Sequence, residues 1–372
     1  MQLEALFERE RGVAGLRSVS ELCNLATLGL ARMYEPEEGL FCYTHSRTHS
    51  GMERRGLSHR YTMMTLLGLH RYERVGGCSP LEIEHVLFRL LKDTAWIGSA
   101  GDLGLLLWAC AEVLPETVRA TYQRVWAADA LSRFSDSRRG FTMEVAWYLT
   151  GLIACYQAGF TDLPGLPEQI GAARTILAGN CGDSGVYGHR SADGRLAGYA
   201  RRRIGSFADQ VYPTIAFARL SKVFDDREAR EMAIRTAVTM CDLQGALGEW
   251  SWHYDAQTGK VVNRYPIYSV HQHAMGPMML FAVSEAMNRN FDEAICRSLA
   301  WISGDNELGR DFVEPGLGLI WRSIYLRRMN KYTDAAFRFV GLRREAANVQ
   351  LQIRHECRPY ELGWLLYAFA GR

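Results

Sequence analysis

The sequence predicts an all-α fold, a closed (α/α)6 toroid of six helical hairpins with short β-hairpin loops on one face. Apolar residues recur at helical spacing along the whole chain, and no part of it alternates strand and helix as a βαβ protein does. Three loops between the expected helices also follow one template. The 372 residues would suffice for two domains, but no linker or shift in composition divides them, so we expect a single domain over 1–372.

Residues that start and stop helices set the bounds of the expected elements. Gly76-Gly77 and Gly159 end helices, whereas Pro80 and Pro115 begin them. We expect helices at 16–34, 58–75, 80–96, 101–113, 115–134, 141–159, 167–179, 206–224, 227–242, 269–288, 291–303, 315–327 and 360–371. The first twelve fill six hairpins. The last follows the strand-like segment VQLQIRHE, so that 340–372 is either a C-terminal addition or a seventh hairpin.

Three stretches, which begin at Gly39, Gly185 and Gly248, lead from one expected helix to the next in the same way. Each contains Gly-x-aromatic, a turn-rich segment, a return strand and an apolar helix whose first turn is polar. The sequences SADG and AQTG are typical of hairpin turns, and we therefore expect short hairpins near 184–204 and 247–266. The repeat of roughly 60 residues exceeds that of linear helical solenoids, which favours a closed toroid.

In such a toroid, all junctions between a loop and the following inner helix open on one face, and polar residues concentrate at these junctions. Eight of the ten histidines lie there, at His45, His49, His59, His189, His253, His271, His273 and His355. Only His70 and His85 lie elsewhere. Scattered surface histidines would not be distributed in this way, so this face is the expected functional face.

Candidate catalytic residues on this face are those that can transfer a proton or stabilise an anion. They are Asp209, His271, His273, Glu144 and Arg60. Candidate substrate-binding residues are Trp250, Trp252, Tyr254, Tyr268, Gln272, His189, Tyr43 and Glu361. The alternative for Glu144, Asp209 and Glu361 is that an acid in the first turn only caps its helix.

The aromatic residues and arginines have both a functional and a purely structural interpretation. Trp250, Trp252 and Tyr254 alternate along an expected strand, so they would share one face that could stack on a cyclic ligand. They could equally be packing residues of the hairpin. Arg60 and the run 201–203 supply guanidinium groups that could bind a carboxylate, although the run could also be a solvated loop.

No metal and no cofactor are expected. His271-x-His273 would bring two imidazoles together on a strand, but on a helix they diverge by about 200°. HExxH, paired CxxC and EF-hand patterns do not occur. The glycine motifs of nucleotide-binding proteins and the GxSxG motif are also missing from the sequence, which argues against a kinase, a dehydrogenase or an α/β-hydrolase.

Charge and cysteine usage restrict the expected partners and location. The net charge of +2 gives no general reason to bind nucleic acid, and no apolar run is long enough to predict a membrane-spanning helix. The first residues do not read as a secretory signal. Nine widely spaced cysteines without a CxxC pair predict reduced thiols in a cytoplasmic protein. The sequence leaves a homodimer open.

The hairpin segments GLFCYTH, GVYGHR and GEWSWHYD resemble those of six-hairpin carbohydrate-active enzymes. This group includes unsaturated glucuronyl hydrolases, α/α-barrel polysaccharide lyases and N-acylglucosamine 2-epimerases. The resemblance implies an enzyme that acts on a sugar or oligosaccharide, expected to bear a uronate, by acid–base chemistry. Glycoside hydrolysis, β-elimination and epimerisation all remain open.

Two further resemblances and one non-catalytic function compete with this interpretation. Gln244 to Trp250 is similar to the Q-x-G-x-W repeat of terpenoid cyclases, but their DxDD motif does not occur. Lanthionine cyclases are seven-hairpin toroids whose zinc ligands include a Cys-His pair, and no Cys-His dipeptide is present. A glycan-binding protein without catalysis is the remaining alternative.

Overall fold

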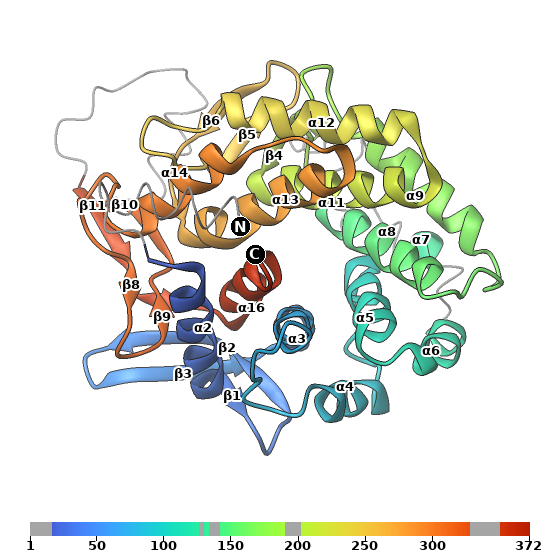
Figure 1. Cartoon of the computed structure of the whole chain (residues 1–372), viewed down its shortest axis with the longest axis horizontal. Coiled ribbons are helices and arrows are strands. Elements are labelled where there is room, and N and C mark those ends of the chain that lie inside the picture. The colour runs from blue at the N-terminus through green and yellow to red at the C-terminus, as the bar shows by residue number, and fades with distance from the viewer. Residues whose placement is uncertain (1–16, 126–129, 134–141, 190–201, 328–349) are drawn as a thin grey trace.

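The computed structural model describes residues 17–125, 130–133, 142–189, 202–327 and 350–372, and its helices form two concentric rings (Figure 1). The inner ring consists of α3 (His59–Glu73), α5 (Ala100–Val113), α8 (Thr142–Gln157), α11 (Phe207–Phe224), α13 (Gly276–Met287) and α16 (Pro359–Phe369). The outer ring consists of α2 (Val19–Met33), α4 (Ile83–Lys92), α6 (Val118–Arg124), α9 (Leu166–Gly179), α12 (Arg227–Asp242) and α14 (Asp292–Ile302). Inner neighbours are in contact all the way around, including α16 with α3, which confirms the predicted closed toroid.

Three predicted helices differ in detail from the observed elements. The segment expected as 115–134 is a 3₁₀ turn, η1 (Pro115–Thr117), followed by α6 and the short α7 (Ala130–Arg133). The helix expected at 269–288 begins with a π-helical turn, η3 (His271–Met275), and continues as α13. The helix expected at 80–96 ends at Lys92.

The predicted helix at 315–327 is wrong. This segment forms a small hairpin of β8 (Val313–Glu314) and β9 (Leu319–Ile320), followed by β10 (Ser323–Arg327). Gly318 adopts a φ of 70°, which is incompatible with a right-handed helix. The sixth inner helix is instead α16, the expected thirteenth helix, which packs against α2 and α3. Of the expected addition at 340–372, residues 340–349 lie outside the described part of the chain.

Short strands connect the outer helices to the inner ones. The first loop contains β1 (Tyr34–Glu35) and a hairpin of β2 (Leu40–Thr48) and β3 (Gly51–Leu57), and β12 (Glu356–Cys357) pairs with β2. The hairpin predicted near 247–266 is confirmed as β5 (His253–Asp255) and β6 (Lys260–Asn263), with β4 (Ile204–Ser206) beside β5. A third sheet contains β7 (Ile267–Tyr268), β10 and β11 (Gln350–Arg354). The SADG turn expected near 184–204 lies outside the described residues.

Each template glycine seats its loop against the next outer helix. Gly248 has a φ of 85°, and a Cβ atom there would lie 2.3 Å from the carbonyl oxygen of Arg297 in α14. Gly318 makes the same approach to α2, where its Cβ would lie 2.6 Å from the amide nitrogen of Gly29. Only glycine fits such a position, because the backbone is in the left-handed region and a Cβ atom would collide with the backbone of the neighbouring helix.

An arginine of that next helix then binds the carbonyl groups of the docked loop. Arg297 donates to the carbonyl of Gly245 at 2.6 Å, and Arg89 of α4 donates to that of Pro36 at 2.9 Å. Arg32 of α2 donates to the carbonyl of Gly316 at 2.8 Å, which joins the last loop to the first helix. The outer ring is thus closed by repeated contacts between a loop and the helix that follows it.

The described residues also test the expectations on cysteines and membranes. All nine cysteines are free thiols, and six of them are buried, as the sequence predicts. Within the described ranges, the structure contains no helix that combines the length and apolarity needed to cross a membrane.

We predict that Gly248→Ala destabilises the fold by at least about 1–3 kcal/mol, because alanine would be strained in the left-handed region and would push against the Arg297 carbonyl. The control is Gly171→Ala in α9, where a Cβ would meet nothing within 4 Å. That substitution should stabilise the protein slightly, since alanine is the better helix former. Urea denaturation of both variants checks this, and equal stabilities would contradict the docking role of Gly248.

Candidate active site

Serine N-caps start three of the inner helices and fix the residues that point into the mouth of the ring. Ser99 accepts a hydrogen bond from the amide of Asp102, and Ser206 accepts one from the amide of Asp209. Ser58 caps α3 in the same way. The serine hydroxyls cap free N–H groups at the starts of α5 and α11, and these caps fix Asp102 and Asp209 in the first turns of the two helices.

Arg60, Asp102 and Glu144 form a charged cluster across the first turns of α3, α5 and α8. The Nε atom of Arg60 donates to Oδ1 of Asp102 at 2.7 Å, and one terminal nitrogen of Arg60 lies 3.3 Å from Oε1 of Glu144. The guanidinium also lies over the ring of Trp147, with 5.3 Å between its carbon and the ring centroid. The predicted residues Arg60 and Glu144 are thus brought together, and Asp102 joins them although the sequence analysis did not select it.

Glu144 is almost completely buried and only half satisfied. Its Oε2 atom has no hydrogen-bond partner among the described residues. Burial raises the pKa of this carboxyl, and the nearby Arg60 opposes that shift only in part. A carboxyl with a raised pKa retains its proton at a pH where an ordinary glutamate has lost it, which is what a proton donor requires.

His189 and Asp209 form a second polar pair. The Nδ1 atom of His189 lies 2.9 Å from Oδ2 of Asp209, which is fully buried, whereas about one third of the His189 side chain is exposed. Oδ2 of Asp209 also accepts hydrogen bonds from the backbone and the hydroxyl of Ser206. Asp209 therefore caps α11, as the alternative interpretation supposed, and in addition orients an accessible imidazole.

A backbone hydrogen bond connects His189 to the first turn of α8, which also contains Glu144. The amide of Thr142, the first residue of α8, donates to the carbonyl of His189 at 2.9 Å. Glu144 follows Thr142 by two residues in the same first turn. The backbone of His189 is therefore attached to the end of α8 that contains Glu144.

His271 and His273 are buried in the turn η3. Burial lowers the pKa of each imidazole to about 3. The positive charge of Arg322 contributes for His271, and His273 is within 3.3 Å of the carbonyl of Glu361. Both imidazoles stay neutral and are weak bases, so their chemistry does not favour the catalytic role predicted for them. Within the described residues, no group of three or more potential metal ligands occurs.

Gln272 occupies a structural position that also occurs, at Gln210, in the preceding hairpin. Its side-chain oxygen accepts the amide of Trp250 at 3.0 Å, and its nitrogen donates to the carbonyl of Tyr268. In the same manner, the side-chain oxygen of Gln210 accepts the amide of Tyr187 at 2.7 Å, and its nitrogen donates to the carbonyl of Ser206 at 3.0 Å. The amide of Gln272 is therefore occupied by the template itself, and we correct its predicted substrate contact.

The aromatic row predicted for one strand face is divided between the core and the surface. Trp250 and Tyr254 are fully buried and pack against Phe207, at centroid distances of 5.4 and 6.4 Å. They are packing residues, and the prediction that they bind substrate is wrong. Trp252 and Tyr268 are partly exposed and meet edge to face at 6.1 Å, so these two remain candidates.

The Q-x-G-x-W similarity also has a structural explanation. The side chain of Gln244 donates to the carbonyls of Gly248 and Ala294, both at 2.9 Å. The glutamine thus ties the template loop to the start of α14. This similarity reflects how the loop is packed rather than a shared chemistry.

A cluster around Arg322 was missed by the sequence analysis. Arg322 forms a buried ion pair with Glu361 of α16 and lies over the ring of Tyr268 at 5.0 Å. Next to it, Arg358 binds Glu356 at 2.8 Å and the hydroxyl of Tyr61 at 2.7 Å. Both arginines lie in the segments that the sequence suggested were a helix or a separate addition, so no signal connected them with the ring mouth.

Glu361 and Tyr43 differ in their access to a substrate. Glu361 is fully buried, and both its oxygens are used, one by Arg322 and one by the amide of Arg358. We therefore correct its predicted substrate contact to a structural ion pair. Tyr43 is 43% exposed, stacks on Tyr61 at 5.3 Å and accepts a hydrogen bond from Arg358, so it remains a candidate.

No protein-family model and no curated protein matches the sequence. Solved structures, in contrast, share the fold over nearly the whole chain. An unsaturated glucuronyl hydrolase from Streptococcus agalactiae has a TM-score of 0.61 at 11% identity, over 95% of this chain and 92% of that chain. The enzyme from Bacillus sp. GL1, described as responsible for glycosaminoglycan degradation, has a TM-score of 0.59 at 13% identity, over 95% and 96%.

A third solved structure, an unsaturated glucuronyl hydrolase specific for heparin, has a TM-score of 0.58 at 15% identity, over 94% of this chain and 95% of that chain. Similarity at these identities establishes the architecture. These similarities confirm the (α/α)6 toroid predicted from the sequence. They also confirm its resemblance to the fold of unsaturated glucuronyl hydrolases.

We predict that Arg322→Ala destabilises the protein by about 3–5 kcal/mol, because it leaves the carboxyl of Glu361 buried without its partner. Arg119→Ala, which breaks the exposed pair with Asp162, is the control and should change stability little. Chemical denaturation at neutral pH measures both. A small effect of Arg322→Ala would show that Glu361 is reached by water.

We also predict a contribution of the buried histidines to acid unfolding. The pKa of His271 is about 3 in the folded protein, against about 6.5 when unfolded, so the unfolded chain takes up the proton first as the pH falls. Between pH 6 and 4, this histidine should cost about 1.4 kcal/mol of stability per pH unit. His271→Asn should remove that part of the slope, whereas exposed His85→Gln should leave the slope unchanged. Parallel stability curves for the wild type and His271→Asn would contradict the buried neutral state.

Proposed function

We propose that the protein is a carbohydrate-active enzyme that hydrolyses a glycosidic linkage of a uronate-bearing sugar at the mouth of the inner ring. The observation that carries the proposal is the state of Glu144. One of its oxygens is held by Arg60, and the other is buried without a described partner, on the face where six inner helices begin.

Glu144 is the proposed proton donor. Its pKa is raised by burial, and the contact with Arg60 fixes the orientation of the carboxyl group. In glycoside hydrolysis, a protonated carboxyl gives its proton to the oxygen of the leaving group as the bond breaks. Arg60 anchors one oxygen of Glu144, and the other oxygen has no partner among the described residues, so it is available to carry the proton that is donated.

His189 is the proposed partner that activates water, and Asp209 is its positioning residue. A carboxylate bound to Nδ1 fixes the tautomer of an imidazole and stabilises the positive charge that forms when the imidazole accepts a proton. The exposure of His189 and its attachment to the first turn of α8 support this role. Asp102 keeps Arg60 in place through the hydrogen bond at 2.7 Å.

Arg60 is the proposed contact for the uronate carboxylate. Its Nε atom and one terminal nitrogen are engaged by Asp102, Ser99 and Glu144, and its other terminal nitrogen makes no hydrogen bond to the described residues. About a third of the side chain is exposed. A guanidinium group so held presents a fixed donor to a planar anion. The shared architecture with glucuronyl hydrolases supports the same substrate class.

The two competing functions make different demands. A terpenoid cyclase requires an apolar reaction chamber, whereas the mouth of this ring carries Arg60, Asp102, Glu144 and the His189–Asp209 pair. A glycan-binding protein would hold the sugar without turnover. Binding of a uronate disaccharide without its hydrolysis would favour that second function and would contradict our proposal.

We predict that Glu144→Gln lowers kcat by roughly 10²–10⁴-fold on uronate-terminated disaccharides, with little change in stability. The control is Glu116→Gln, an exposed carboxylate outside the ring mouth, which should leave kcat unchanged. For the wild type, kcat/KM should fall as the pH rises through the raised pKa of Glu144, because the carboxyl then loses the proton that it donates. Full turnover by Glu144→Gln would place the reaction elsewhere.

Comparing a uronate-terminated disaccharide with its neutral counterpart distinguishes binding of the carboxylate from cleavage of the glycosidic bond. The wild type should prefer a disaccharide that ends in a uronate over the same disaccharide with an unoxidised sugar. Arg60→Gln should weaken that preference mainly by raising KM for the uronate. Any loss of activity of this variant on the neutral sugar measures how far the substitution also disturbs Glu144. Equal activity of the wild type on both sugars would exclude the uronate as a substrate determinant.

A further inference from the structure

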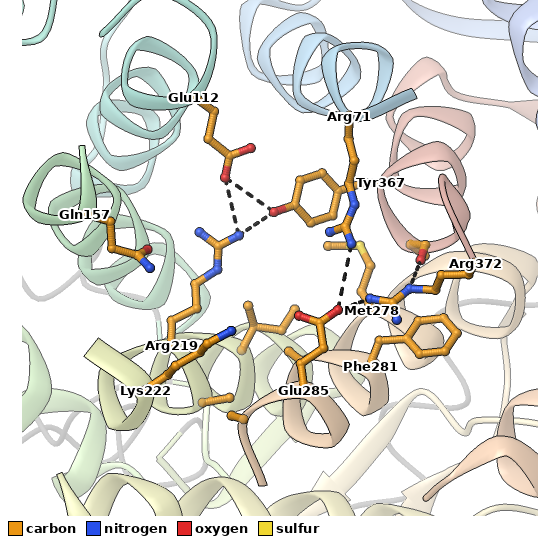
Figure 2. A pocket seen from close by; sticks show the side chains of 15 residues that line it. Arg71, Glu112, Gln157, Arg219, Lys222, Met278, Phe281, Glu285, Tyr367 and Arg372 are labelled. Carbon is orange, nitrogen blue, oxygen red and sulfur yellow. Dashed lines mark hydrogen bonds and ion pairs between the residues drawn. The ribbon is translucent and has the colours of Figure 1, made fainter. Parts of the chain in front are cut away.

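A second charged cavity lies at the opposite end of the inner ring, where the six inner helices end (Figure 2). It measures about 260 Å³. Each inner helix contributes to its lining, which includes Arg71, Glu112, Gln157, Arg219, Lys222, Glu285 and Tyr367. Arg372, which follows α16, completes the lining. None of these residues belongs to the proposed active site.

An aromatic layer separates this cavity from the mouth of the ring. Arg219 lies over the ring of Trp108 at 4.6 Å on the cavity side, and Trp108 packs against Trp364 at 5.7 Å. The indole N–H of Trp364 donates to the hydroxyl of Tyr212 at 2.9 Å. Tyr212 in turn meets Trp147, the ring beneath Arg60. The two ends of the ring are therefore distinct sites with a packed core between them.

Positive side chains outnumber negative ones in the cavity. Arg71, Arg219, Lys222 and Arg372 stand against Glu112 and Glu285. Arg219 pairs with Glu112 at 3.5 Å and with the hydroxyl of Tyr367, whereas Arg71 and Arg372 share Glu285. Two carboxylates thus serve three guanidinium groups, and the side chains carry a surplus of two positive charges.

Lys222 has no counter-ion among the residues that the structure describes. It makes no hydrogen bond or ion pair with any described residue, although it points into the cavity beside Arg219 (Figure 2). Cations in the last turn of a helix also offset the partial negative charge of the helix end. That effect explains why cations gather there, but it does not require an open space between them. An empty volume lined by convergent cations is the arrangement expected of an anion-binding site.

We propose that this cavity binds a small phosphorylated molecule, with the phosphate between Arg219 and Lys222. Guanidinium groups bind phosphate oxygens through paired hydrogen bonds, and an ammonium group adds a mobile point charge. Two negative charges match the surplus of two positive ones. Ile215, Met278 and Phe281 line the rest of the cavity and provide apolar surface for the body of the ligand.

The experiment measures binding by calorimetry at constant ionic strength, with inorganic phosphate, glucose 6-phosphate and glucose as probes. The wild type should bind both phosphates and should not bind glucose. Lys222→Glu should weaken phosphate binding by tenfold or more, and it should fold normally because Lys222 has no described partner to lose. Lys92→Glu makes the same charge change in the last turn of outer helix α4, outside the cavity, and should bind as the wild type does.

The two phosphate probes distinguish the sources of the phosphate group. Tighter binding of glucose 6-phosphate indicates a phosphorylated metabolite, and equal binding indicates the phosphate ion, and both results support the site. No binding of either phosphate, or equal binding by Lys222→Glu and the wild type, would overturn it and leave the cations as partners of the helix ends. Because the readout is binding and not turnover, the outcome does not depend on the proposed hydrolysis.

Discussion

The structure depends on a contact that recurs in three of the described loops, where the connecting loop docks against the next outer helix. A left-handed glycine allows the loop backbone to touch that helix, and an arginine of the same helix binds the loop carbonyls. The contact of Gly318 with Gly29 and of Arg32 with Gly316 joins the last loop to the first helix and so closes the ring. These three loops seat the inner helices that follow them at one end of the toroid, where the first turns of the inner helices converge.

Convergence of the helix ends has electrostatic consequences at both ends of the ring. At the mouth, the positive ends of the helices stabilise acidic side chains in the first turns. The converging helices then bring these acidic side chains near one another. Arg60 relieves part of the repulsion between Asp102 and Glu144, while burial still raises the pKa of Glu144. At the other end, cations gather for the opposite reason. One architecture therefore creates two polar sites around a single aromatic core.

The sequence predicted the parts of this arrangement that repeat. Helical periodicity and the Gly-x-aromatic template were sufficient for the toroid, for the hairpin at 253–263 and for the convergence of Arg60 and Glu144. The similar loop at Gly318 was overlooked because Gly318-Leu319-Ile320 lies in an apolar run that also fits a helix, and only the φ of Gly318 distinguishes the loop from a helix. Residue types alone could not distinguish Trp250, which is packed in the core, from Trp252, which reaches the surface.

Side-chain partners that come from distant segments were also beyond sequence reasoning. The pair of Arg322 with Glu361 and the opposite cavity join residues whose contacts arise only when the ring closes. The measurement that tests the central claim most directly is a crystal structure of Glu144→Gln with a uronate-terminated disaccharide. We expect the sugar carboxylate at Arg60 and the glycosidic oxygen within about 3 Å of the side chain at position 144. A sugar bound only in the opposite cavity or on the outer ring would contradict the account.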